Sequence, residues 1–323
     1  MKSLMITEND ANQRLDKFIA KAAPALPKNL LYKYLRTKRI KLNGKRAEIS
    51  VRLHAGDRVD LYINDEFFGG SDKKNHDFLS APKSLDIVYE DGNILILDKK
   101  AGVLCHPDGS EYTDTLIARV KRYLYEKGEY DPDAENSFIP SLANRIDRNT
   151  GGLVLAAKNA EALRVLNQKI KDRELTKRYK CVAIGEMPAR HEILTGFLRK
   201  DSDKNKVFIS NREKPDSRPI RTEYTVLGEK DGLSLLEINL LTGRTHQIRA
   251  HLAHIGHPLL GDGKYGTNEQ NKKFGGYKKQ CLYSYSVTFD FKTDAGILSY
   301  LNGRTFSTDD IWFEKAFYDG TLY

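Results

Sequence analysis

The chain has 323 residues, 40% hydrophobic and 30% charged, a balance typical of a soluble globular protein with room for two domains. Its three cysteines, Cys105, Cys181 and Cys281, are far apart, which excludes a disulfide framework and a cysteine-based metal site. No apolar run is long enough to span a membrane, and residues 1–12 contain no signal-peptide core. We therefore expect a cytoplasmic protein.

The net charge of +9 is concentrated near the N-terminus. Residues 14–52 contain twelve Lys or Arg and two acidic residues, whereas residues 53–323 carry no net charge. Lysines scattered over a solvated surface would spread along the whole chain. Such a concentration in one short segment instead favours a polyanionic partner.

The first 64 residues predict a small α/β domain. Apolar spacing predicts helices over 14–22 and 28–37, and the Asn43-Gly44 turn followed by an alternating strand over 59–63 predicts a small sheet. This arrangement resembles the S4-like RNA-binding domain. Five bunched cations are the candidates for contacts to RNA phosphates: Lys33, Arg36, Lys38, Arg39 and Lys41. Residues 65–84 are polar and rich in turn residues, which indicates a linker.

The remaining chain, residues 85–323, alternates strands and helices. The predicted strands span 86–89, 94–98, 153–157, 179–185, 207–210, 223–227 and 233–241. The predicted helices span 113–127, 160–173 after an N-cap at Asn159, and 245–255 before Gly256 and Pro258. The acidic segment 128–138 is expected to be a surface loop.

The segment 144–158, NRIDRNTGGLVLAAK, is the centre of the functional hypothesis. Arg145 and Asp147 are two residues apart, so both face one space if the chain is extended there. The Gly151-Gly152 pair predicts a sharp turn before a buried strand, which places Asp147 on a loop at the edge of a sheet. The alternative is that Asp147 only closes an Asx turn.

This segment resembles the signature of the RluA family of pseudouridine synthases, a His-Arg-Leu-Asp-Arg core followed by Thr-x-Gly. Asn144 and Ile146 depart from that core. Lys177 and Tyr179 match the family's Lys-x-Tyr motif, and residues 242–266, TGRTHQIRAHLAHIGHPLLGDGKYG, resemble its third motif. In the first motif, Asn-Lys-Pro-x-Gly, Lys99 and Gly102 match, whereas Lys100 replaces the usual Pro.

The resemblance implies an α+β architecture, in which the S4-like domain precedes a catalytic domain with a mixed, largely antiparallel sheet, flanking helices and a central cleft. It implies that Asp147 is the nucleophile or base, that Arg249 pairs with it, and that Tyr179 stacks on the base and could remove the C5 proton. Arg145 is the candidate to fill the space that a flipped-out uridine leaves. The expected substrate-binding residues are Arg145, Arg148, Lys177, Arg244 and His246. Neither a cofactor nor a metal is expected.

Relatives with an S4-like domain often modify large-subunit (23S) ribosomal RNA, so that RNA or a ribosomal precursor particle is the expected partner of a monomeric enzyme. Transfer RNA stays open as a substrate. One alternative function is a catalytically inactive RNA-binding factor for ribosome assembly. A second is a metal-dependent RNA hydrolase that uses the four histidines His246, His251, His254 and His257, of which His251 and His254 have a plausible i, i+3 spacing.

Overall fold

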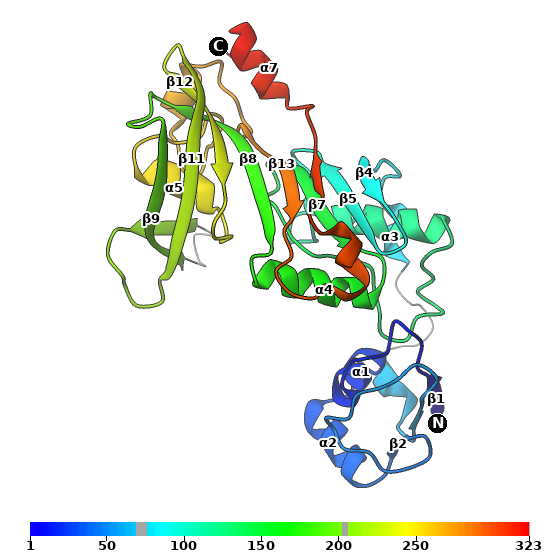
Figure 1. The fold of residues 1–323 in the computed structure, drawn as a ribbon. Helices are drawn as coiled ribbons and strands as arrows, with labels where there is room; N and C mark the ends of the chain where they lie inside the picture. Colours follow the sequence, from blue (N-terminus) through cyan, green and yellow to red (C-terminus); the bar gives the residue numbers. More distant parts are fainter. Residues whose placement is uncertain (69–75, 202–205, 323) are drawn as a thin grey trace.

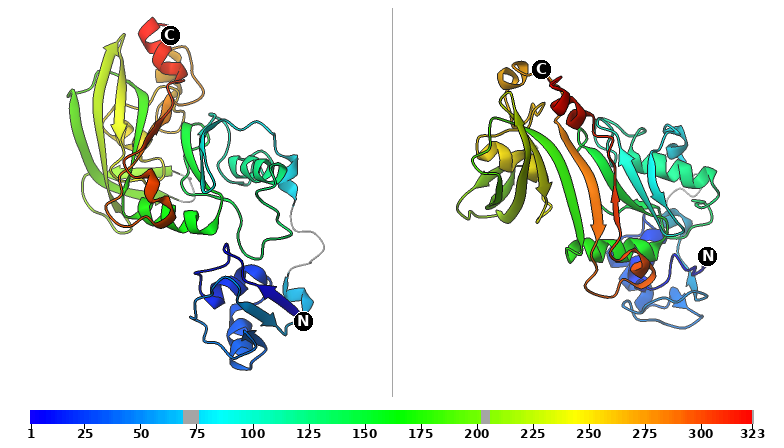
Figure 2. Two further views of the ribbon diagram at one scale, coloured as in Figure 1. Left: turned by 45° about the vertical axis from the view of Figure 1, so that its right-hand side comes forward. Right: turned by 45° about the horizontal axis from the view of Figure 1, so that its top comes forward.

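The computed structural model describes residues 1–68, 76–201 and 206–322, and it divides into two units with separate sheets (Figure 1). Residues 69–75 of the expected linker lie outside the described residues. An N-terminal unit with a three-stranded sheet lies beneath a larger unit that is built on an eleven-stranded sheet (Figures 1 and 2). In the described residues, no helix is both long and apolar enough to cross a lipid bilayer.

The N-terminal unit contains the two predicted helices, α1 (Leu15–Ala22) and α2 (Lys28–Arg36). They pack on a sheet of order β1-β3-β2, formed by β1 (Lys2–Met5), β2 (Ile40–Leu42) and β3 (Arg58–Leu61). The turn at Asn43-Gly44 is confirmed, because both residues have positive φ and the flanking Leu42 and Lys45 exchange two backbone hydrogen bonds. Strand β1 was not predicted, since four residues give too short a pattern.

The two units meet through a polar contact around Asp10, which is fully buried. Its carboxylate accepts hydrogen bonds from Asn136 at 2.8 Å and from Ser137 at 2.6 Å, and Asn9 donates to Glu135 at 2.6 Å. The prediction that residues 128–138 form a surface loop is therefore wrong in part. The end of that segment lies between the two units, because its polar side chains supply partners for a buried carboxylate.

The large sheet has the strand order β10-β9-β11-β12-β8-β13-β7-β5-β4, with β14 paired to β13 and β6 paired to β7. Its strands are β4 (Ile87–Glu90), β5 (Ile94–Lys99), β6 (Ser141–Leu142), β7 (Gly151–Ala157), β8 (Leu175–Ile184), β9 (His191–Asp201), β10 (Lys206–Ser210), β11 (Arg218–Lys230), β12 (Leu233–Asn239), β13 (Leu282–Phe289) and β14 (Thr305–Ser307). Only the β13–β7 pair is parallel among the described strands. The expected mixed, largely antiparallel sheet with flanking helices is confirmed.

Helices cover both faces of this sheet (Figure 2). Leu95 and Leu97 of β5 share a core with α3 (Leu116–Glu126), whereas Ile96, on the opposite face, packs with Leu166 of α4 (Ala160–Lys171). A strand buried on both faces has no alternation of apolar and polar residues, which explains its continuous apolar run. The predicted N-cap is confirmed, since the Asn159 side chain accepts the Ala162 amide.

The C-terminal part contains α5 (Gln247–His254), α6 (Asn268–Lys272) and α7 (Trp312–Asp319), of which only α5 was predicted. Strands β9 and β13 were not predicted either. Helix α3 begins at Leu116 rather than at residue 113, because the side chain of Thr115 caps it. Both ends of the main strand path, β4 and β10, were therefore predicted from the sequence, whereas the central strand β13, strand β9 and the C-terminal helices α6 and α7 were not.

Candidate active site

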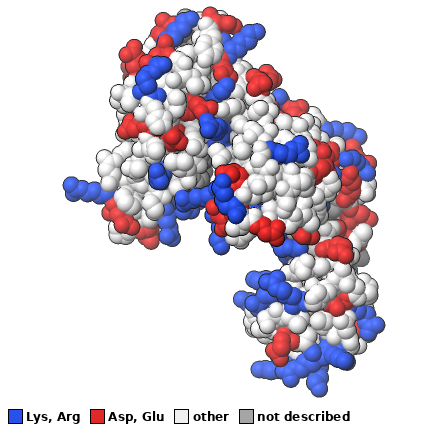
Figure 3. Space-filling model, in the orientation of Figure 1, with Lys and Arg blue, Asp and Glu red and all other residues white. Residues whose placement is uncertain are grey.

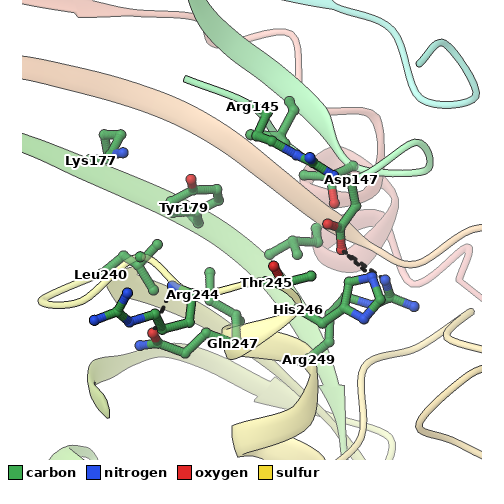
Figure 4. Close-up of a pocket in the computed structure, with 15 residues that line it drawn as sticks. Arg145, Asp147, Lys177, Tyr179, Leu240, Arg244, Thr245, His246, Gln247 and Arg249 are labelled. Carbon is green, nitrogen blue, oxygen red and sulfur yellow. Dashed lines mark hydrogen bonds and ion pairs between the residues drawn. The ribbon is translucent and has the colours of Figure 1, made fainter. Parts of the chain in front are cut away.

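The loop between β6 and β7 carries the expected pair of functional residues. Ile146 is buried, whereas Arg145 on one side is exposed and the Asp147 side chain on the other is 24% exposed. This alternation turns Arg145 and Asp147 to one side of the loop, and both line the same pocket, as predicted (Figure 4). The turn is closed by the Thr150 amide, which donates to the backbone carbonyl of Asp147 at 3.1 Å. The side-chain carboxylate of Asp147 contacts Arg249 instead.

The Gly151-Gly152 pair does not form the predicted turn but begins β7, so the turn lies just before it. Gly152 has φ of 112°, and a Cβ there would lie 2.2 Å from the carbonyl oxygen of Ser284. A Cβ at Gly151 would lie 2.4 Å from the ring of Tyr283. The two glycines therefore allow β13 to approach the first residues of β7 closely, where β7 follows the loop that carries Asp147.

Lys99, at the end of β5, supports the same loop from beneath. Its side chain is 1% exposed, and its ammonium donates to the carbonyl of Arg148 at 3.0 Å and to that of Val103 at 2.8 Å. Gly102 completes the contact, because its amide donates to the Arg148 carbonyl at 2.7 Å. Lys99 and Gly102 thus both contact the Arg148 carbonyl although Lys100 replaces the proline of the motif. Lys99 was noted only as a motif match and not as a site residue.

Arg249 of α5 joins two carboxylates. Its Nη1 donates to Oδ2 of Asp147 at 2.7 Å, and its Nε and Nη2 donate to the two oxygens of Asp262 at 2.7 and 2.9 Å. The Asp262 side chain is 0% exposed and that of Arg249 is 9% exposed. Both carboxylates raise the pKa of Arg249 against the effect of burial, and Arg249 in turn holds the pKa of Asp262 below its usual value. Asp262 was not among the predicted site residues.

Beside this ion pair lies a pocket of about 810 Å³, including the space that opens to solvent. Tyr179 and Lys177 of β8 form one wall, and Leu240, Ile248 and Leu282 add apolar surface (Figure 4). Burial raises the pKa of Tyr179 to about 12, so its phenol is protonated near neutral pH. Burial lowers the pKa of Lys177, whose ammonium makes no hydrogen bond to the described residues.

The other predicted substrate-binding residues line two different pockets. Arg244 and His246 line the pocket that contains Tyr179. Arg148 does not line that pocket, because its guanidinium turns back and donates to the Gly102 carbonyl at 3.0 Å. It lines a second hollow, of about 1240 Å³ including open space, which shares Arg145, Asp147, His246 and Arg249 with the first. Asp147 thus lies between two adjoining hollows.

The four histidines of the alternative metal site bind separate partners. The ring of His246 contacts the Tyr265 hydroxyl at 2.9 Å and that of His251 contacts Thr222 at 3.0 Å. His254 contacts Asn211, and His257 contacts the Ile184 carbonyl. Within the described ranges, no group of three or more His, Cys, Asp or Glu side chains could hold a metal ion. Of the four, only His251 and His254 lie within α5, and their side chains contact different partners.

Two solved human structures have the same fold of the larger unit. The human RNA pseudouridylate synthase domain-containing protein 1 superposes with a TM-score of 0.53 at 20% identity, over 72% of this chain and 94% of that chain. Domain-containing protein 4 superposes with a TM-score of 0.54 at 17% identity, over 69% and 88%. The chain therefore shares its fold with these two proteins.

Sequence comparisons give the family. Residues 93–254 match the family described as RNA pseudouridylate synthase, and residues 13–59 match the S4 domain. An uncharacterized RNA pseudouridine synthase of Mycoplasma genitalium is 32% identical over 88% of both chains. The ribosomal large subunit pseudouridine synthase C of Buchnera aphidicola is also 32% identical over 88% of both, and that of Vibrio cholerae is 31% identical over 85% and 82%. The chain belongs to the RNA pseudouridine synthase family, with an S4 domain at its N-terminus.

Proposed function

We propose that this chain isomerises specific uridines of large-subunit ribosomal RNA to pseudouridine, with Asp147 initiating cleavage of the glycosidic bond. The observation that carries the proposal is the carboxylate of Asp147, held by Arg249 at 2.7 Å at the mouth of a pocket large enough for a pyrimidine nucleotide. Relatives that are named ribosomal large subunit pseudouridine synthases support the choice of RNA.

The isomerisation breaks the bond between C1′ and N1 and forms a bond between C1′ and C5. C5 loses its proton and N1 gains one, so nothing is oxidised and no atom leaves. The hydrogen-bonded ion pair with Arg249 fixes the direction of the Asp147 carboxylate. Tyr179, on the opposite wall, would stack on the uracil ring. For Tyr179 to remove the C5 proton it would first have to ionise, which its pKa of about 12 opposes.

The target uridine must leave the RNA stack to reach this pocket. Arg145 lines the pocket, is exposed and has no ion pair to the described residues, and these features support its proposed role of filling the space that the uridine vacates. Lys177 and Arg244 line the pocket as further cations that the proposal assigns to the substrate, whereas Arg148 would contact RNA in the adjoining hollow.

The N-terminal unit would supply sequence-independent affinity. Its basic residues Lys33, Arg36, Lys38 and Arg39 are exposed, and cationic side chains cover its surface at the lower end of the molecule (Figure 3). The guanidinium of Arg39 stacks on Tyr34 at 4.5 Å, and the ammonium of Lys41 lies 5.3 Å from the ring centre of Tyr62. Such cations bind phosphates and hold the RNA in position.

The decisive experiment uses large-subunit ribosomal RNA transcribed in vitro with tritium at uridine C5. The wild-type protein should release the label without cofactor, and mapping of pseudouridines in cells with and without this gene should identify the site. The Asp147→Asn variant should bind the RNA normally and release no label. If the wild type binds RNA without releasing label, the chain is a binding factor instead. Substantial release by Asp147→Asn would remove Asp147 from the mechanism.

A further inference from the structure

The ring of His246 stands at the end of a chain of hydrogen bonds. The Val207 amide donates to the Tyr265 hydroxyl at 3.0 Å, and that hydroxyl lies 2.9 Å from Nδ1 of His246. No other acceptor for the Tyr265 proton is present among the described residues. We take the phenol as the donor to Nδ1, which puts the proton of the neutral imidazole on Nε2.

The backbone fixes where this N–H points. His246 is the N-cap residue of α5 and has left-handed φ and ψ of 52° and 19°, which few residues other than glycine adopt. Its ring packs edge-on against Tyr265. Burial is the main cause that lowers the pKa of His246, and the cations Arg249 and Lys264 act in the same direction against Asp147 and Asp262. The imidazole is thus neutral and oriented in advance.

The Nε2 atom of His246 lies 3.8 Å from Oδ2 of Asp147. This distance is too long for a hydrogen bond, but one oxygen atom can lie within hydrogen-bonding distance of both. That oxygen must accept from the imidazole and donate to the carboxylate, which a hydroxyl group of the substrate can do, as can a water molecule in its absence. A phosphate oxygen carries no proton to donate, and the uracil ring has its donor and acceptors on separate atoms.

Within an RNA chain, the ribose of an internal nucleotide has a single free hydroxyl, the 2′-hydroxyl, because its 3′ and 5′ oxygens are esterified. The contacts of Arg249 and His246 both fall on Oδ2 of Asp147, which leaves Oδ1 for chemistry at the glycosidic bond. We propose that His246 and Asp147 together bind the 2′-hydroxyl of the target uridine, and that His246 is the residue by which this site distinguishes RNA from DNA. This inference rests on the proposed function, since it requires the uridine to enter this pocket.

The test measures binding, so that it does not depend on turnover. The affinities of the trinucleotides UpUpU and dUpdUpdU are measured by NMR titration of protein labelled with ¹⁵N in its histidines. The wild type should prefer the ribose form, and His246→Ala should reduce that preference about tenfold, the effect of one hydrogen bond to a charged site. His254→Ala is the matched control, because His254 lies on the same helix but faces Asn211, and it should leave the preference unchanged.

Two further variants separate a role in binding from a role in folding. His246→Gln keeps an N–H near the position of Nε2 and should retain part of the ribose preference. Tyr265→Phe should release the tautomer, which the ¹⁵N shifts of the imidazole report directly. An unchanged ribose preference in His246→Ala, or an Nδ1–H tautomer in the wild type, would overturn the inference. Label release from ribosomal RNA by the wild type tests the proposed function separately.

Discussion

The carboxylate of Asp147 is oriented by Arg249, whose position is set in turn by Asp262 behind it. Two of the three hydrogen bonds from this guanidinium go to Asp262 and one goes to Asp147. Asp262 is further fixed by the amides of Lys264 and Tyr265, which donate to Oδ1 at 2.9 and 3.2 Å. The orientation of Asp147 therefore depends on a fully buried residue that cannot touch RNA.

The Asp262→Asn variant tests this dependence. It removes one buried charge and leaves Arg249 with a single carboxylate, so we expect the free energy of unfolding to fall by about 3 kcal/mol. We also expect kcat to fall by about tenfold or more, because Arg249 loses the partner that fixes its direction. Thermal unfolding and label release at saturating RNA measure the two effects.

The exposed pair Lys292–Asp290, with side chains 68% and 54% exposed, provides the matched control. Asp290→Asn removes an equal charge from a surface ion pair, so stability and kcat should change little. If Asp262→Asn behaved like Asp290→Asn, the arrangement around Arg249 would have no role in orienting Asp147.

The Lys99→Met variant removes the support beneath the Asp147 loop. Burial lowers the pKa of Lys99 to about 8, yet its ammonium donates to the carbonyls of Lys100, Val103 and Arg148. Loss of these three bonds should cost about 3 kcal/mol of unfolding free energy and lower kcat through displacement of the loop. RNA affinity should be retained, since Lys99 is buried away from solvent. Hydrogen exchange of the loop amides would show an unchanged loop if this assignment were wrong.

How far the sequence predicts the site depends on the range of the interactions. Asp147 and Arg145 were placed on one side of their loop because alternation along an extended chain is local. The resemblance to the family placed Tyr179 and Arg249, which lie far from them in the sequence. Asp262 and Tyr265 were missed although they lie in the quoted third motif, because their roles arise from contacts with Arg249 and His246 that no spacing reveals. Strand β9 was missed because the polar and apolar residues of its sequence alternate only weakly.

The pH dependence of stability should include a contribution from His251. This buried imidazole has its pKa lowered to about 4, mainly by burial, whereas in the unfolded chain it titrates near 6.5. Between these values the unfolded state binds one more proton, so the free energy of unfolding falls as the pH falls from about 6.5 to 4, by up to about 3 kcal/mol. The His251→Asn variant should show a flatter profile in that range in chemical denaturation. An identical slope in both proteins would mean that His251 is protonated in the fold.

The contribution of the N-terminal unit can be separated from catalysis with the triple variant Lys33→Gln, Arg36→Gln, Lys38→Gln. These exposed cations contact no part of the pocket around Asp147, so KM for ribosomal RNA should rise while kcat stays the same. The slope of the logarithm of affinity against the logarithm of salt concentration should decrease by about 2, as expected for three lost phosphate contacts. The control replaces Lys171, Lys272 and Lys315, three exposed lysines of the larger unit, by Gln. Equal loss of affinity in both triple variants would indicate that the RNA responds only to net charge, and that the S4 domain does not form the RNA-binding surface.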